Sequence, residues 1–300
     1  MKERWSRQSA VMRQQKYLWL ASFPKSGNTW FRSFLSALIQ GKVEINKLAS
    51  DGILSGRHLI NQIHDLDTGL LFDNEVKNCY ARAYAYNASI VPHLQIIKVH
   101  DAYHNDDHGI PIVDIESTYK AVYLVRNPLD VVASYANHNN CTIDHAIKMM
   151  CDKEGVLGSK IRGLGSKLQV PQLMYDWSGH VSSWLDQDKV ELVVVRYEDM
   201  KKGEAEFIKI AKAIGFECSD EEVIEAVELT KFEKLKKQEE EKGFKEKMVE
   251  TKSFFRSGKS GGWKSELTPE QAWIIVDAHK KVMDRLGYLE PALEHLNNLK

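Results

Sequence analysis

Four short apolar runs place the strongest constraint on the fold of this chain. All four are rich in Val, Ile, Leu and aromatic residues, and they cover Tyr17–Phe23, Gln95–His100, Ala121–Arg126 and Val190–Tyr197. Three of them lack the alternating polar residues of a strand with one face in water, as expected for strands that are covered on both faces. The pattern predicts a parallel β-sheet inside the protein.

Segments with the apolar spacing of helices separate or follow these runs. They cover Thr29–Ile39, Leu129–Ala136, Leu173–Leu185 and Ala205–Ile214. Alternating strands and helices are typical of an α/β fold in which a central parallel β-sheet is flanked by helices. Ligands bind such sheets beyond the carboxyl ends of the strands. Each apolar run ends on polar chemistry at Lys25-Ser26, His100, Arg126 or Tyr197, so we expect the functional site at that edge.

The composition fits a single domain that spans residues 1–300. Apolar residues make up 43% of the chain and charged residues 28%, and the formal net charge of -1 argues against a nucleic-acid partner. No apolar run approaches the roughly 20 residues that span a bilayer, and the N-terminal extension, residues 1–16, lacks the apolar core of a secretory signal. The four cysteines form no Cys-x-x-Cys pair, which indicates reduced thiols, no zinc site and a cytoplasmic location.

Two segments are predicted to be mobile loops. Residues 138–172 contain four glycines and few core residues, so we expect them to form a mobile cover. Residues 233–262 begin with a charge run that extends to residue 250, which indicates a solvated helix followed by a loop.

The first run leads into the sequence Phe23-Pro24-Lys25-Ser26-Gly27-Asn28-Thr29-Trp30. A strand, a tight turn with glycine and a helix that begins at Asn28 or Thr29 place free backbone N–H groups where they can bind an anion. Lys25 adds a positive charge, and the hydroxyl groups of Ser26 and Thr29 add hydrogen-bond donors. The loop is shorter than the Gly-x-x-x-x-Gly-Lys-[Ser/Thr] loop of triphosphatases. A plain strand–helix junction with an exposed lysine is the alternative.

Two later motifs are also suited to anions. In Arg126-Asn127-Pro128-Leu129-Asp130-Val131-Val132-Ala133-Ser134-Tyr135, proline in the first helical turn lets Arg126 and Ser134 point at one anion. A surface ion pair is the alternative for that arginine. The segment Phe254-Phe255-Arg256-Ser257-Gly258-Lys259-Ser260-Gly261-Gly262-Trp263-Lys264 is either a phosphate-binding loop or a flexible linker.

In this order the motifs resemble those of the cytosolic sulfotransferases, which use 3′-phosphoadenosine 5′-phosphosulfate (PAPS). The first loop resembles the family's 5′-phosphosulfate loop, with only Asn28 in place of threonine, and Arg126 and Ser134 match its 3′-phosphate motif in spacing. The resemblance runs from about residue 17 to 285 and implies a P-loop-like sulfotransferase fold. It implies that the 5′-phosphosulfate is bound by Lys25, Ser26, Gly27, Asn28 and Thr29.

The resemblance extends to the rest of the cofactor site. The segment that begins at Phe254 is similar to the family's Arg-Lys-Gly-x-x-Gly-x-Trp-Lys loop, which closes over the 3′-phosphate. Arg256 and Gly258 match it, and Ser257 replaces its lysine. The residues implied to contact or border adenine are Trp30, Tyr197, Thr230 and Phe232.

His100 ends the run Gln95-Ile96-Ile97-Lys98-Val99-His100. A lone histidine at a strand end is usually structural, but Lys98 and His100 match the family's Lys-x-His. The resemblance implies that His100 removes the proton of the acceptor as it attacks sulfur, while Lys25 and Lys98 stabilise the developing charge without a metal. The product of the cofactor is then 3′-phosphoadenosine 5′-phosphate (PAP).

The acceptor is expected to be a small molecule, sulfated on a hydroxyl group, with nitrogen as the alternative. The stretch that follows the base is acidic, and we hypothesise that a polar or cationic acceptor is favoured by Asp101, Asp106, Asp107 and Asp114. Metal binding by His104 and His108 is a weaker interpretation of the same stretch, because a loop fixes no ligand spacing.

Two other functions stay open from the sequence. A kinase-type phosphotransferase would need a full triphosphate loop with magnesium ligands, and a non-catalytic PAP-binding module would not need His100 and Lys25. We expect neither a nucleic-acid nor a membrane partner. A homodimer is an open question, because the family's dimer motif is met only by Lys264 and Thr268 and fails at Pro269 and Trp273.

Overall fold

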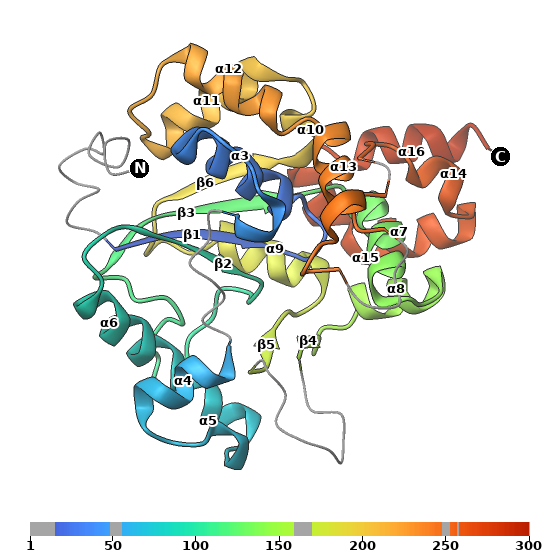
Figure 1. The fold of residues 1–300 in the computed structure, drawn as a ribbon. Helices are drawn as coiled ribbons and strands as arrows, with labels where there is room; N and C mark the ends of the chain where they lie inside the picture. Colours follow the sequence, from blue (N-terminus) through green and yellow to red (C-terminus); the bar gives the residue numbers. More distant parts are fainter. Residues whose placement is uncertain (1–15, 49–55, 159–169, 248–252, 257, 300) are drawn as a thin grey trace.

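The computed structural model describes residues 16–48, 56–158, 170–247, 253–256 and 258–299. Its centre is a parallel sheet in the order β2-β1-β3-β6 (Figure 1). The strands are β1 (Tyr17–Ser22), β2 (Gln95–Val99), β3 (Thr118–Val125) and β6 (Leu192–Arg196). Leu20 of β1 pairs with Lys98 on one side and with Val122 on the other. The predicted parallel sheet and its four strands are confirmed.

Alternate residues of β1 belong to two different cores, which explains why its sequence is apolar throughout. Tyr17, Trp19 and Ala21 pack into one core, and Leu18 and Leu20 pack into the other. Because successive side chains of a strand point to opposite faces, both faces of the sheet are covered. The edge strand β6 is more exposed: the side chain of Val194 is 42% exposed.

Helices form a layer on each side of the sheet (Figure 1). One layer contains α3 (Asn28–Gln40), α11 (Glu204–Ile214) and α12 (Asp220–Leu229). The other contains α6 (Tyr80–Ile90), α7 (Pro128–Asn139), α9 (Trp177–Leu185) and α15 (Pro269–Arg285). This arrangement of a parallel sheet between helices is the predicted α/β architecture.

The remaining elements are short. The helices are α4 (Arg57–His64), α5 (Asp73–Lys77), α8 (Ile143–Met150), α10 (Tyr197–Met200), α13 (Phe232–Lys242), α14 (Trp263–Glu266) and α16 (Leu289–Asn297). Single 3₁₀ turns occur at Ile45–Lys47 and Thr68–Leu70, and β4 (Val156–Leu157) pairs antiparallel with β5 (Gln172–Leu173). Within the described part of the chain, no helix has the length and apolar character needed to cross a membrane.

The described part of the segment 138–172 contains more secondary structure than its glycines suggest. Helix α8 lies within it, and Ala146, Ile147 and Met150 of that helix are buried. The predicted helix Leu173–Leu185 begins only at Trp177, because the side chain of Asp176 accepts a hydrogen bond from the backbone N–H of Gly179 and caps the helix there. The glycines at 163 and 165, like residues 1–15, lie outside the described residues.

The described part of the charge run, residues 233–247, forms a helix followed by a turn, as predicted. However, α13 is not solvated on all sides, since Leu235 and Glu239 are buried. The carboxylate of Glu239 accepts hydrogen bonds from the backbone N–H groups of Phe254 and Phe255, at 2.6 and 2.9 Å. The helix therefore anchors the late glycine-rich segment to the rest of the fold.

Candidate active site

A pocket of about 1060 Å³ lies where the parallel strands end. It contains thirteen of the residues that the sequence assigned to the site: Lys25, Gly27, Asn28, Thr29, Trp30, Lys98, His100, Arg126, Ser134, Tyr197, Phe232, Arg256 and Gly258. Most of them come from the β1–α3 turn, from the ends of β2 and β3, and from α7 and α10. The others are Phe232 at the start of α13 and the pair Arg256 and Gly258. Motifs that are more than 200 residues apart in the sequence therefore line the same pocket.

The turn between β1 and α3 has the shape of an anion-binding loop. Gly27 adopts φ +98°, and α3 begins at Asn28, as predicted. The side-chain amide of Asn28 donates to the backbone oxygen of Leu20 and to the hydroxyl of Ser22, both at 3.2 Å, which ties the turn to β1. The first N–H groups of α3 have no acceptor within the helix, so they are available to a ligand.

Replacing Gly27 with Ala should both destabilise the protein and weaken ligand binding. A Cβ atom there would lie 2.7 Å from the ring of Tyr197, in addition to the strain of the left-handed backbone. We expect a loss of about 1–2 kcal/mol in the free energy of unfolding, measured by urea denaturation. Gly109→Ala is the control, because Gly109 also has a positive φ, +77°, and has open space around it. Equal losses in the two variants would contradict a role for close packing at Gly27.

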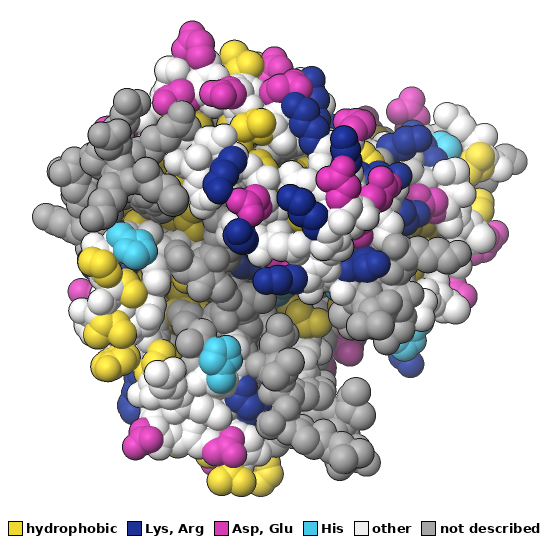
Figure 2. Space-filling view, in the orientation of Figure 1, with side chains coloured by type: hydrophobic (Ala, Val, Ile, Leu, Met, Phe, Trp, Pro, Cys, Tyr) yellow, Lys and Arg dark blue, Asp and Glu magenta, His cyan; other side chains and the backbone are white. Residues whose placement is uncertain are grey.

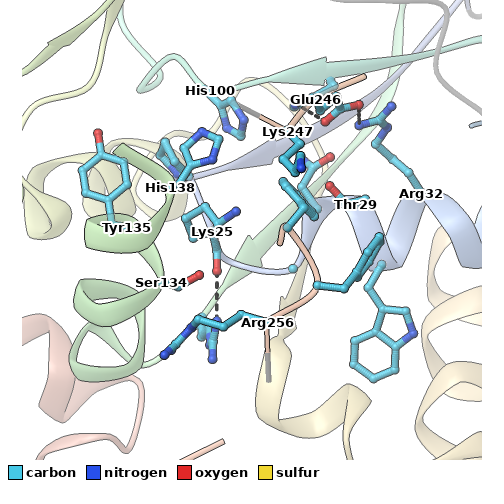
Figure 3. A pocket seen from close by; sticks show the side chains of 18 of the residues that line it. Lys25, Thr29, Arg32, His100, Ser134, Tyr135, His138, Glu246, Lys247 and Arg256 are labelled. Atoms are coloured by element: carbon cyan, nitrogen blue, oxygen red, sulfur yellow. Dashed lines mark hydrogen bonds and ion pairs between the residues drawn. The ribbon is translucent and has the colours of Figure 1, made fainter. Parts of the chain in front are cut away.

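Buried cations crowd around this turn. The Lys25 ammonium lies 3.8 Å from the centre of the Phe254 ring, and burial, together with Lys98 and Arg126, lowers the pKa of Lys25 to about 7. The guanidinium of Arg126 donates to the backbone oxygens of Lys25 and Lys259 at 3.3 and 3.0 Å (Figure 3 shows the first). Such a concentration of positive charge is stabilised by a bound anion.

An unpartnered polar atom beside the turn fits the same ligand. Arg126 lines the pocket, and its Nε is a buried donor without a hydrogen-bond partner among the described residues. A buried donor left unpaired costs about 1–3 kcal/mol, which a bound anion recovers. Flat side chains lie nearby: Trp30 contacts Tyr197 edge to face, with ring centres 5.6 Å apart. The residues present therefore fit a phosphorylated nucleotide.

His100 is held in one tautomer. Its Nδ1–H donates to the backbone oxygen of Ser22 at 2.7 Å, which leaves Nε2 with a free lone pair. Burial, and then the charge of Lys98, lower the pKa of His100 to about 3, so the ring is neutral at pH 7. The backbone oxygen of His100 accepts a hydrogen bond from Nε2 of the buried His180, at 2.9 Å. A neutral imidazole of this kind can accept a proton.

Glu246 is a pocket residue that the sequence analysis missed. Its carboxylate accepts from Arg32 Nη1 at 2.7 Å and from Lys98 Nζ at 3.1 Å (Figure 3). Burial opposes the charge of this carboxylate, but the two cations hold the pKa of Glu246 at about 2. The charge run gave no signal for this role, because a glutamate in a lysine-rich segment is typical of an exposed surface.

Some predicted site residues lie elsewhere. Thr230 does not line the pocket: it is fully buried, and its hydroxyl donates to the backbone oxygen of Val227 at 2.9 Å, at the end of α12. Ser26 is buried beneath the turn rather than on the pocket wall. Arg256 lines the pocket but forms an ion pair with Glu266 at 2.8 Å. Ser257 lies outside the described residues.

The acidic stretch after the base does not line the pocket among the described residues, so direct contact of its carboxylates with the acceptor has no support there, and its effect on the acceptor stays a prediction. Asp101 is buried, and its carboxylate accepts a hydrogen bond from the backbone N–H of Leu173. The carboxylate of Asp106 accepts hydrogen bonds from two backbone N–H groups of its own turn. Asp107 forms an ion pair with Lys77. The described residues that line the pocket include none of these aspartates and not Asp114. The described chain also has no cluster of three potential metal ligands.

The charge of the pocket is strongly positive. Eight of its described lining residues are Lys or Arg, and Glu246 is its one acidic residue among them. Figure 2 shows Lys and Arg side chains gathered across the middle of the face in view. This excess of cations argues against a cationic acceptor and favours anionic ligands.

Comparison with known proteins decides the family. Residues 15–287 match the model of the sulfotransferase domain. The chain belongs to the sulfotransferase family. The protein is thus a sulfotransferase, and the kinase-type alternative is wrong. Its relatives include cytosolic sulfotransferase 13 of Arabidopsis thaliana (26% identical, over 83% of this chain and 71% of the relative) and flavonol 3-sulfotransferase of Flaveria bidentis (26% identical, over 90% and 81%).

Solved structures share the fold of this sulfotransferase. Mouse sulfotransferase SULT7A1, in complex with PAP, has a TM-score of 0.57 at 19% identity and covers 94% of this chain and 88% of its own. Retinol dehydratase, in complex with retinol and PAP, has a TM-score of 0.59 at 18% identity, with coverages of 91% and 82%. At these identities the likeness shows the fold, and the predicted sulfotransferase fold is confirmed.

Proposed function

We propose that this sulfotransferase moves a sulfuryl group from PAPS to a hydroxyl of a small-molecule acceptor, with His100 as the base. The observation that carries the proposal is the fixed tautomer of His100, whose free Nε2 belongs to the same pocket as Lys25 and Arg126. Relatives named for flavonols and two solved structures that contain PAP support both the cofactor and the acceptor class. The names of several relatives also support a cytoplasmic location.

In this reaction the acceptor O–H loses its proton to His100 Nε2 while its oxygen forms a bond to sulfur. The bond between sulfur and the bridging phosphate oxygen breaks, and PAP leaves with the electron pair. Lys25 stabilises the charge on that oxygen, and Lys98 stabilises the charge on the sulfuryl oxygens, as lysines and metals do in phosphoryl transfer. His100 then releases its proton to solvent.

The cofactor contacts follow from the two phosphates. Arg126 and Ser134 hold the 3′-phosphate, and the β1–α3 turn holds the 5′-phosphosulfate. Trp30, Tyr197 and Phe232 provide flat surfaces for adenine, which stacks favourably on aromatic rings. We also propose that the chain functions as a single sulfotransferase domain.

Calorimetric titration tests the cofactor. We expect PAP to bind much more tightly than AMP, which lacks the 3′-phosphate, and more tightly than ATP with magnesium. Equal binding of PAP and AMP would remove the 3′-phosphate site from the proposal. A preference for ATP with magnesium would contradict PAPS as the cofactor.

The pH dependence tests the role of Lys25. Because its pKa is lowered to about 7 and its charged form is needed, we expect kcat/KM for PAPS to fall as the pH rises above 7. From pH 7 down to 5 no comparable loss is expected, because the His100 base stays neutral until the pH approaches about 3. Lys25→Arg should remove the alkaline limb, since arginine keeps its charge. A profile that is flat to pH 9 in the unaltered protein would contradict this role.

A further inference from the structure

The pocket lining contains an unpaired amide oxygen. Gln172 lines the pocket and is only 1% exposed, and its Oε1 atom is buried without a hydrogen-bond partner among the described residues. Leaving such an oxygen unpaired costs about 1–3 kcal/mol. A ligand that donates a hydrogen bond to this oxygen recovers that free energy.

The fold holds Gln172 close to the base. Gln172 pairs with Leu157 in the β4–β5 ribbon, and both residues line the pocket. The next residue, Leu173, accepts a hydrogen bond from the backbone N–H of Ala102 at 2.7 Å and donates to the carboxylate of Asp101 at 3.2 Å. The ribbon is thus fastened to the two residues that follow His100, so the position of Gln172 is set relative to the base.

A second polar group enters from α7. His138 lies one helical turn after Ser134, so the two side chains share a face of the helix, and both line the pocket. Figure 3 shows the imidazole of His138 pointing into the pocket near Lys25 and His100. It makes no hydrogen bond to a described residue. Burial, then the charges of Lys25 and Lys98, lower the pKa of His138 to about 4, so the ring is neutral and can both donate and accept.

We propose that Gln172 and His138 bind a second oxygen of the acceptor, beside the hydroxyl that His100 deprotonates. The acceptor is then a compound with two neighbouring hydroxyl groups, such as a catechol or a vicinal diol, and it is neutral or anionic because the pocket is rich in cations. This inference rests on the proposed sulfuryl transfer from PAPS and names the acceptor class for it. A site built to bond a hydroxyl rejects analogues that lack it, because its own polar groups are then left unpaired.

The test compares catechol with phenol as acceptors of the full chain at saturating PAPS. We expect kcat/KM to favour catechol by tenfold or more. Gln172→Leu and His138→Phe should each reduce that preference by about tenfold, which corresponds to one lost hydrogen bond. His145→Phe is the matched control, because the side chain of His145 is exposed on α8, and it should keep the preference. Calorimetry with PAP runs in parallel on all four proteins.

Each outcome has a separate meaning. Equal use of catechol and phenol, or variants that retain the preference for catechol, would overturn the inference while leaving the proposed function intact. Turnover of neither compound by a protein that binds PAP would also overturn it. Failure to bind PAP would overturn the proposed function, and the acceptor assignment with it.

Discussion

Replacing His100 with Asn should lower kcat for sulfuryl transfer by about 10²–10⁴, the usual contribution of a positioned general base. Asparagine can keep the hydrogen bond to the backbone oxygen of Ser22, because its amide group still donates. It cannot accept the proton at the position of Nε2. The loss should therefore appear in turnover, measured with saturating PAPS and acceptor, and the dissociation constant for PAP should stay within a few-fold of its original value.

His108→Asn is the matched control for this variant. His108 is exposed on the loop that follows the base, and its side chain is not part of the pocket. Its replacement should leave kcat unchanged. If His100→Asn retained more than a tenth of the activity, another group would have to take the proton, and His138 would be the first candidate on geometric grounds.

Replacing Arg126 with Ala should raise the dissociation constant for PAP by about 30- to 4000-fold. Removing one member of a buried, hydrogen-bonded charge pair typically costs about 2–5 kcal/mol. Arg126 lines the pocket and is 9% exposed, and its Nε donor has no partner among the described residues, so this donor is available to a ligand. Calorimetric titration measures the change.

Two comparisons separate phosphate binding from loss of structure. The affinity for AMP should change much less than that for PAP, because AMP lacks the 3′-phosphate. Arg126→Lys should bind PAP with intermediate affinity, since lysine keeps the charge but not the planar fork of donors. Thermal unfolding of each variant shows whether the fold survives the loss of the bonds to the backbone oxygens of Lys25 and Lys259. An equal loss for AMP and PAP would contradict the 3′-phosphate assignment.

The architecture could be predicted because buried parallel strands need apolar residues on both faces. Tyr17–Ser22 shows this directly, since every residue of the strand is buried. Helix limits were harder to predict. The start of α9 depends on the cap of Asp176 and on the pairing of the two residues of β5 with β4, and a partner that is distant in sequence leaves no local signal. Helix α8 was missed because the glycines that follow it dominate the composition of its segment.

The cofactor half of the site could be predicted because each of its motifs is local. Lys25 and Gly27 lie in one turn, and Arg126 and Ser134 lie eight residues apart, at the end of β3 and in α7. Glu246 could not be predicted in the same way: its partners Arg32 and Lys98 are 214 and 148 residues away in the sequence. Conversely, the aspartates after His100 are near the base in sequence but do not line the pocket. Their carboxylates accept hydrogen bonds from backbone N–H groups or form an ion pair with a lysine.

The pocket is built from two kinds of segment, and this has a consequence for how such an enzyme can diversify. The nucleotide side uses strand–helix junctions that the sheet itself fixes, whereas Leu157 and Gln172 belong to a two-stranded ribbon outside that sheet. Changes in the ribbon can alter the acceptor without disturbing the junctions. Exchanging the ribbon between relatives should therefore produce chimeras that keep their nucleotide and take on a new sulfation target.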